Sequence, residues 1–340
     1  MTAYNEVDGI PCTANPFLTN QLLRDQWGFS GFVVSDLYAI DGLMSQRVAA
    51  GRDEAGILAL RSGVDSDLGG NCFSADLVRA CREGRLAEAD IDRAVSRILR
   101  LKFKMGLFDN PYVKVKKAEK LIGTSGHREV AREVARQSVV LLKNENQLLP
   151  LSKEVKRVAV IGPNADNVYN QLGDYTAPQA PGSVITVLEG IRQKLPGAEV
   201  RYVKGCAVRD TLDTSIGEAC ETAKNSDVVV VVLGGSSARD FETDFLETGA
   251  AVANERKVSD MESGEGFDRI GLSLMGKQVE LLKALYATGR PVVLVMVQGR
   301  PLELNWAAEH IPAILTTWYP GGEGGRAIAD VLFGDYNPAG

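Results

Sequence analysis

The stretch Gly28-Phe29-Ser30-Gly31-Phe32-Val33-Val34-Ser35-Asp36 indicates how the first part of the chain folds. It contains glycines, then a short apolar run with β-branched residues, then a carboxylate just past that run. A short apolar run bounded by glycines is typical of a strand buried on both faces, as in a parallel sheet. In parallel α/β folds the ligand binds outside the carboxyl ends of the strands, which is where Asp36 is expected. The alternative is that Asp36 only caps the next helix.

The residues around this stretch predict alternating strands and helices. Apolar residues at helical spacing predict helices at 17–27 and 53–61, and a further short strand is expected at 63–68. Two more helices are expected at 73–82 and 86–105. Strands and helices joined by short connections predict a β/α repeat.

A lysine-rich stretch separates this part from a second one. We divide the chain into a first domain at 1–108, a linker at 109–126 and a second domain at 127–340. The second domain is expected to be an α/β sandwich with a mainly parallel sheet covered on both faces. Its predicted strands are 158–161, 199–203, 228–233, 292–297 and 313–317, and helices are expected at 186–194, 216–224, 275–286 and 325–332.

The composition excludes several classes of function. The net charge is −6 with dispersed basic residues, which argues against nucleic-acid binding, and no apolar run reaches the length of a membrane span. Five cysteines without CxxC spacing predict free thiols. His127 and His310 are the only histidines, so a histidine-based triad or a multi-histidine metal site is close to excluded. We expect no cofactor and no metal, and catalysis by carboxylates if the protein is an enzyme.

A second stretch, Glu262-Ser263-Gly264-Glu265-Gly266-Phe267-Asp268-Arg269, carries acidic residues between a strand and a helix. The glycines beside Glu265 let the backbone bend and bring the carboxylate to a ligand. Taken alone, the alternative is a solvent-exposed acidic loop, and the same alternative applies to the charged stretch 239–247. Together with Asp36, Glu265 meets the need of glycoside hydrolysis for two carboxyl groups, one at the sugar centre and one protonating the leaving oxygen.

Several motifs, in one order along nearly the whole chain, resemble glycoside hydrolase family 3. Met1-Thr2-Ala3-Tyr4-Asn5, Trp27-Gly28-Phe29 and the run ending at Asp36 resemble its nucleophile region. Residues 263–269 resemble its acid/base loop, and 138–150, 158–166 and 319–340 resemble its second domain. The last segment includes Gly321-Gly322-Glu323-Gly324-Gly325, which lacks the spacing of a phosphate-binding loop and is expected to form a tight turn.

The resemblance implies retaining hydrolysis of terminal β-linked sugars. β-Glucosides are favoured, and β-xylosides or α-arabinofuranosides are the alternative. Asp36 would be the nucleophile, and Glu265 the acid/base, with their carboxyl groups about 5–5.5 Å apart. Met1 and Tyr4 match positions that line the sugar site, and the Tyr4 hydroxyl is expected to hydrogen-bond the nucleophile. Many members have Trp after the nucleophile, whereas Leu37-Tyr38 follows here, so Tyr38 is the candidate sugar-contacting ring.

The first domain is too short for a complete barrel, which needs about 250 residues. The resemblance therefore implies the C-terminal part of a (β/α)8-type barrel, with the family's sugar-binding Asp, Arg and Lys-His residues upstream of Met1 in a longer, periplasmic or secreted parent. We predict that the isolated chain is nearly inactive and that the exposed barrel remnant favours homo-oligomers. The alternative from another class is a non-catalytic α/β module that binds carbohydrate or a partner.

Overall fold

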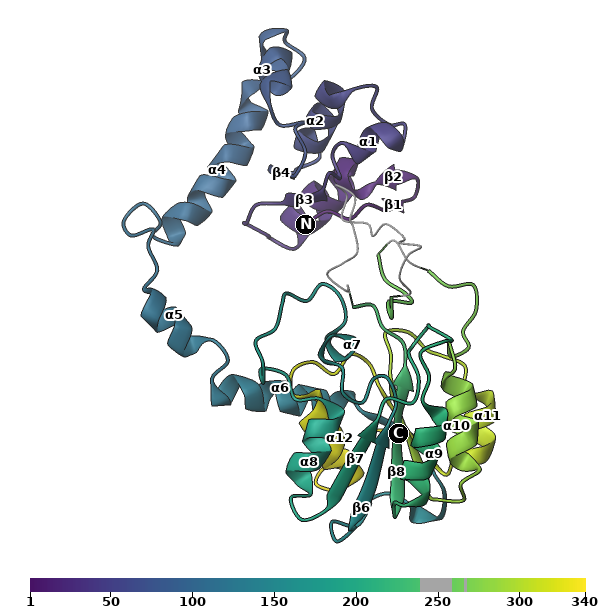
Figure 1. Cartoon of the computed structure of the whole chain (residues 1–340). Helices are drawn as coiled ribbons and strands as arrows, with labels where there is room; N and C mark the ends of the chain where they lie inside the picture. Colours follow the sequence, from purple (N-terminus) through teal and green to yellow (C-terminus); the bar gives the residue numbers. More distant parts are fainter. Residues whose placement is uncertain (239–258, 266–267) are drawn as a thin grey trace. The chain divides into compact units, whose positions relative to one another are not determined.

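The computed structural model describes residues 1–238, 259–265 and 268–340, and the chain divides into two units (Figure 1). Unit 1 comprises Met1–Ala118 and unit 2 comprises Glu119–Gly340. Helices alternate with strands that pair mainly in parallel, so the predicted α/β class with a mainly parallel sheet is confirmed. In the described part of the chain, no helix is both long and apolar enough to span a membrane.

Unit 1 contains a short parallel pair of strands. β3 (Val34–Leu37) pairs in parallel with β4 (Ser66–Leu68). Asp36 lies within β3 rather than past its end, and the expectation of a strand buried on both faces is wrong. Ser35 is buried, but the other residues of β3 keep partial exposure, because β4 is the one described strand that pairs with β3.

Helix α2 (Arg52–Arg61) lies at the centre of unit 1. Its residues Ala55 and Ala59 pack in one apolar cluster, and Ile57 and Leu60 pack in a second one. All four predicted helices of this unit are present, with small differences at their ends. The remaining elements are β1 (Glu6–Val7), β2 (Ile10–Pro11), the helical turn η1 (Cys12–Ala14), the wide helix η2 (Phe17–Gln26), α1 (Gly42–Ser45), α3 (Ala75–Arg82) and α4 (Glu88–Lys104).

The stretch 109–126 that we expected to be a linker contains a helix. This helix, α5 (Val115–Leu121), has no buried residue. Its apolar side chains, such as Val115 and Leu121, are 63% and 53% exposed. The stretch is therefore helical without contributing to an apolar core.

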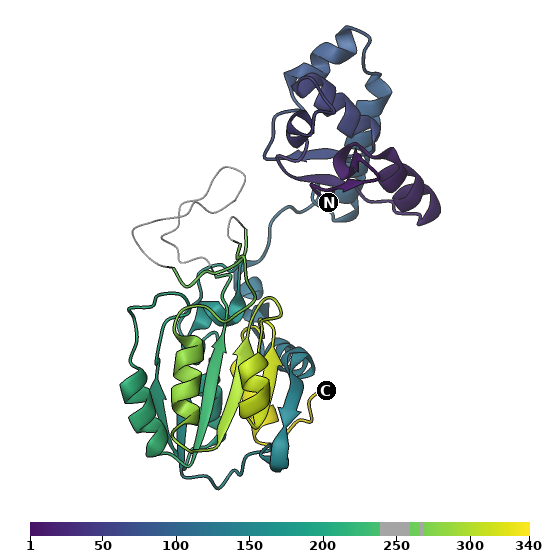
Figure 2. The ribbon, with the colours of Figure 1, turned by 90° about the vertical axis from the view of Figure 1, so that its right-hand side faces the viewer.

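Unit 2 is a six-stranded sheet with helices on both faces (Figures 1 and 2). All neighbouring strands are parallel except β5, which pairs in the antiparallel direction with β10 at one edge. The five strands predicted here are present. In sheet order the strands are β5 (Val140–Asn144), β10 (Ala313–Thr317), β9 (Val292–Val297), β8 (Val228–Gly234), β6 (Arg157–Ile161) and β7 (Glu199–Val203).

Alternate residues of the central strands enter two different apolar cores. In β8, Val230 and Val232 belong to the core that includes α8 (Val187–Lys194) and α12 (Gly324–Leu332). Val229 and Val231 belong to the core that includes α9 (Ile216–Lys224), α10 (Gln278–Tyr286) and α11 (Asn305–His310). This alternation follows from the two-residue period of a strand, and it explains why β8 is apolar almost throughout. The helices of unit 2, besides the short turn η3 (Glu145–Gln147), are α6 (Ser125–Ser138), α7 (Val168–Leu172), α8 (Val187–Lys194), α9 (Ile216–Lys224), α10 (Gln278–Tyr286), α11 (Asn305–His310) and α12 (Gly324–Leu332).

Glycines allow α12 to approach α8 closely. A Cβ atom added at Gly325 would lie 1.9 Å from the carbonyl oxygen of Thr186, and one added at Gly190 would lie 2.0 Å from the carbonyl oxygen of Gly325. The Gly325 N–H donates to the carbonyl oxygen of Ile185 at 3.0 Å. The glycine-rich run that precedes α12 is therefore needed for helix packing as well as for the turn.

We expect Gly325→Ala to lower the free energy of unfolding by about 1–3 kcal/mol, because the added methyl group must displace backbone. Gly322→Ala is the matched control, since the nearest neighbour of its Cβ would be the Ser183 carbonyl oxygen at 3.8 Å. The control should change the free energy of unfolding by about 0.5 kcal/mol or less. Urea unfolding of both variants measures the difference, and equal losses would contradict the packing argument.

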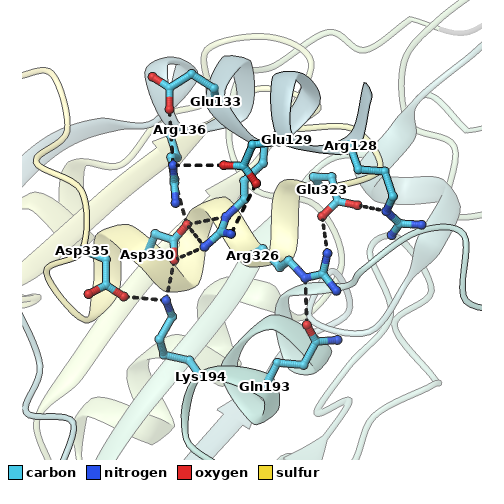
Figure 3. A network of polar contacts seen from close by, with 11 residues as sticks. Arg128, Glu129, Glu133, Arg136, Gln193, Lys194, Glu323, Arg326, Asp330 and Asp335 are labelled. Carbon is cyan, nitrogen blue, oxygen red and sulfur yellow. Dashed lines mark hydrogen bonds and ion pairs between the residues drawn. The ribbon is translucent and has the colours of Figure 1, made fainter. Parts of the chain in front are cut away.

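A buried ion network fastens α6 to α8 and α12. Asp330, in α12, is fully buried and accepts hydrogen bonds from Arg132 and Arg136 of α6, each at 2.8 Å (Figure 3). Lys194, the last residue of α8, pairs with Asp330 and with Asp335. Three cations thus converge on one buried carboxylate. This arrangement attaches α6 to elements that lie much further along the chain.

Candidate active site

The Asp36 side chain in β3 is held by a hydrogen bond from the neighbouring backbone. Its Oδ1 accepts a hydrogen bond from the Leu37 N–H at 2.7 Å, and the residue is half-buried. The first helix after β3 is α1, which begins at Gly42, and no side chain caps its N-terminus. The capping alternative therefore does not account for Asp36.

A buried aspartate fixes the chain just before β3. Asp65 accepts a hydrogen bond from the Val33 N–H at 2.8 Å and pairs with Arg24 at 2.7 Å and with Arg97 at 2.8 Å. Its side chain is 1% exposed, so two cations balance a carboxylate that water does not reach. Asp65 thus connects η2 and α4 to the strand that carries Asp36. Sequence reasoning missed this residue, because its partners lie far away along the chain.

The other predicted sugar-site residues of unit 1 gather around β3. The Thr2 N–H donates to the Val34 carbonyl at 3.0 Å, which places Met1 beside the strand with 75% of its surface exposed. The Tyr4 hydroxyl donates to the Leu37 carbonyl oxygen at 2.7 Å. We expected this hydroxyl to donate to the Asp36 carboxylate. A hydroxyl has one proton to donate, and here the acceptor is the backbone carbonyl oxygen of Leu37.

Tyr38 has a backbone conformation that is unusual for its residue type. Its φ is +55°, in the left-handed region, and its N–H donates to the Leu68 carbonyl oxygen at 2.9 Å. Such a conformation costs about 1–3 kcal/mol in a residue other than glycine and is concentrated at functional sites. The hydrogen bond to β4 holds the turn that follows β3.

One group of side chains in the described part of the chain brings potential metal ligands together. A carboxylate oxygen of Asp41, one of Asp67 and the Cys72 sulfur lie within 4.8 Å of one another. Asp41 also pairs with Arg52 at 3.1 Å, and Asp67 accepts from the Cys72 N–H at 2.9 Å. Burial and the neighbouring carboxylates of Asp41 and Asp67 raise the pKa of the Cys72 thiol to about 12. The group thus has local partners that balance part of its charge.

Glu265 lies in a loop of unit 2 whose backbone needs glycine. Gly264 has φ +125°, and a Cβ atom there would lie 2.9 Å from the Met261 side chain. The Glu265 carboxylate accepts a hydrogen bond from the Tyr175 hydroxyl. Tyr175 follows α7 in the sequence, so a separate segment contacts the predicted acid/base. Residues 266–267 and the charged stretch 239–247 lie outside the described residues.

A buried polar network connects the start of this loop to the sheet. The Asn164 side chain donates to the Val297 carbonyl oxygen at 3.2 Å, and its amide oxygen accepts from Asn170 at 2.9 Å. Ser236 donates to the Asn170 amide oxygen at 2.7 Å, and its carbonyl accepts from the Glu262 N–H at 2.9 Å. Sequence reasoning missed Asn164, Asn170 and Ser236, because neither spacing nor composition distinguishes them from other polar residues.

The chain is similar to known proteins along its whole length. The family model described as "Glycosyl hydrolase family 3 N terminal domain" matches residues 1–101, and "Glycosyl hydrolase family 3 C-terminal domain" matches residues 139–340. A β-xylosidase from Formosa agariphila is 39% identical over 356 residues, which cover 100% of this chain and 46% of that protein. A periplasmic β-glucosidase from Salmonella typhimurium is 36% identical, covering 100% of this chain and 45% of that protein.

Solved structures are similar over the same extent. A β-glucosidase from Erythrobacter marinus has a TM-score of 0.82 and 38% identity, covering 99% of this chain and 45% of that one. A β-glucosidase from Listeria innocua, solved with glucose, has a TM-score of 0.83 and 33% identity, covering 100% of this chain and 43% of that one. The chain thus spans less than half the length of the relatives that it matches.

Proposed function

The chain belongs to glycoside hydrolase family 3, and on this premise we propose that it carries the nucleophile and the acid/base of a retaining glycosidase that releases terminal β-linked sugars. The observation that carries the proposal is the position of Asp36 in parallel strand β3, beside Tyr4, Met1 and Tyr38. Relatives named β-glucosidase and β-xylosidase support both sugars as substrates. A relative named β-xylosidase/α-L-arabinofuranosidase supports α-arabinofuranosides as an alternative substrate.

In the proposed mechanism, Asp36 attacks the anomeric carbon as the glycosidic bond breaks, and Glu265 gives its proton to the leaving oxygen. A covalent glycosyl-enzyme results. Glu265, now ionised, takes a proton from the water that attacks the same carbon and displaces Asp36. Met1, Tyr4 and Tyr38 would contact the sugar.

We further propose that 1–108 forms the C-terminal part of a (β/α)8-type barrel, that 109–126 is the connection, and that 127–340 is an α/β sandwich. The pair β3–β4, the helix that follows each strand, and the covered sheet of unit 2 support this division. We propose little activity for the chain by itself, since it spans 46% of the F. agariphila relative. Exposed aromatic residues at the end of α4, such as Phe103 at 66%, support self-association.

The experiment for the proposed acid uses a fusion protein, in which the remaining part of the F. agariphila β-xylosidase is joined to this chain. Glu265→Gln should lower kcat/KM for aryl glycosides with poor leaving groups by about 10²–10⁴-fold, because these need a proton. The loss should be much smaller for a dinitrophenyl glycoside, whose leaving group departs unprotonated. Glu303→Gln, at an exposed position of unit 2, is the control. Equal losses on both kinds of substrate would argue against Glu265 as the acid.

A further inference from the structure

The loop that carries Glu265 is closed at its base by a buried ion pair. Glu262 precedes Glu265, Arg269 follows it, and a guanidinium nitrogen of Arg269 contacts the carboxylate of Glu262. The Glu262 side chain is 1% exposed and the Arg269 side chain is 6% exposed. Two charges at this depth are stable only as partners, because removing either leaves the other without solvent or counter-charge. The pair therefore ties the two ends of the loop to each other.

Each partner is also anchored outside the pair. The Glu262 N–H donates to the Ser236 carbonyl oxygen at 2.9 Å, and the polar network behind Ser236 reaches the sheet. Arg269 donates through Nε to the Gly271 carbonyl oxygen at 2.6 Å, and through its remaining nitrogen to the Ser273 carbonyl oxygen. Arg209 holds the Met261 carbonyl oxygen at 2.8 Å. The ion pair is thus fixed relative to the sheet of unit 2.

Fixed ends matter because Gly264, directly before Glu265, gives this part of the backbone additional conformational freedom. Gly264 lies in the left-handed region, and glycine loses more conformational freedom on ordering than any other residue. A glycine-containing loop holds a side chain at one point only if other contacts compensate for this loss. Catalytic groups need positions that are defined to a fraction of an ångström.

We propose that Glu262 and Arg269 form a clasp that positions the Glu265 carboxylate. Both are positioning residues, since they act through the loop and not on the sugar. The proposal rests on the proposed role of Glu265 as the acid/base. It adds that this role depends on an ion pair within unit 2 that takes no part in the bond-making steps.

Tyr175 offers a test that does not require turnover. Its hydroxyl donates to the Glu265 carboxylate from a segment outside the clasp. In the full 340-residue chain labelled with 3-fluorotyrosine, the ¹⁹F resonance of Tyr175, assigned with Tyr175→Phe, reports whether the carboxylate is in place. At fixed neutral pH, Glu265→Gln should move this resonance, because the hydroxyl then faces a neutral amide. The Tyr169 resonance serves as the internal reference.

Glu262→Gln should move the Tyr175 resonance most of the way to its position in Glu265→Gln, although both Tyr175 and Glu265 are retained. The double variant Glu262→Gln/Arg269→Met should do the same, and it leaves no buried charge unpaired, which protects the fold. The matched control is Arg300→Gln, which removes an exposed ion pair of the same loop, with Asp268 at 2.9 Å. The control should leave the resonance where it is.

The possible results of this experiment distinguish failure of the clasp proposal from failure of the proposed function. A Tyr175 resonance that stays unchanged in folded Glu262→Gln and in the double variant overturns the clasp. A resonance that does not respond to Glu265→Gln in the parent chain overturns it as well, since the contact on which it depends is then missing. Neither result touches the proposed function, which is tested by the leaving-group experiment. Failure of that experiment with a normal Tyr175 response would instead overturn the role of Glu265.

Discussion

Asp36→Asn in the fusion protein is expected to lower kcat/KM for aryl glycosides by about 10⁴-fold or more, the scale on which loss of a nucleophile acts. An amide cannot form the glycosyl-enzyme, so the first step loses its covalent route. The replacement keeps the size of the side chain, and β3 and the hydrogen bond from the Leu37 N–H can persist. Steady-state kinetics on β-glucoside and β-xyloside substrates measures the loss.

The control for this prediction is Asp76→Asn, which removes a carboxylate of unit 1 that pairs with Arg79 on α3 at 2.7 Å. It should leave kcat/KM close to the parent value. The expected loss in Asp36→Asn does not depend on the leaving group, whereas the expected loss in Glu265→Gln does. Kinetics on both kinds of substrate therefore distinguish the nucleophile variant from the acid variant. An Asp36→Asn protein with more than a small fraction of the parent's turnover would exclude Asp36 as the nucleophile.

Asp330→Ala is expected to destabilise unit 2 by about 3–5 kcal/mol, because it removes the buried carboxylate that three cations share. The side chains of Arg132, Arg136 and Lys194 are 25%, 18% and 17% exposed, so water compensates them only in part. The matched control is Asp227→Asn, which breaks a more exposed pair with Arg157 of similar length, 2.7 Å. It should cost about 0–1 kcal/mol. Urea unfolding of both variants gives the comparison.

The same network predicts how stability depends on pH. Burial alone would raise the pKa of Asp330, but the hydrogen bonds from Lys194, Arg132 and Arg136 outweigh it and lower that pKa. Hydrogen bonds from Lys153 and Lys194 lower the pKa of Asp335 to about 2. Because the pKa is lower in the folded state than in the unfolded state, the ionised carboxylate stabilises the fold at pH values above the unfolded-state pKa, about 3.9. This contribution is lost as the pH falls toward the folded-state pKa of about 2. Asp330→Ala should therefore show a flatter loss of stability below pH ~4 than the parent.

The strands of unit 2 are predictable because local sequence decides them. The runs 199–203, 292–297 and 313–317 are strands with those bounds, since β-branched and apolar residues between turn residues satisfy a sheet covered on both faces. The five cysteines are free, as expected from their number and spacing. The helix α5 is missing from the prediction because its lysine-rich composition is typical of a linker, although Val115, Ala118 and Leu121 recur at helical spacing.

The supports of the site are not predictable from the sequence. Asp65 meets Arg97, and Asn164 reaches Val297, through contacts between residues that are distant along the chain. For Tyr4, the sequence indicates a place beside β3 but the wrong acceptor, because a motif does not determine which of several nearby oxygens a hydroxyl reaches. Motifs indicate which residues act, whereas tertiary contacts determine how they are held.

The most direct test of the account is to trap the covalent intermediate. The fusion protein is incubated with an activated 2-fluoro glycoside, whose glycosyl-enzyme is slow to hydrolyse, and the labelled peptide is identified by mass spectrometry. We expect one sugar on the peptide that contains Asp36, and none in Asp36→Asn. A sugar attached to another carboxylate, in a protein that still turns over substrate, would contradict it.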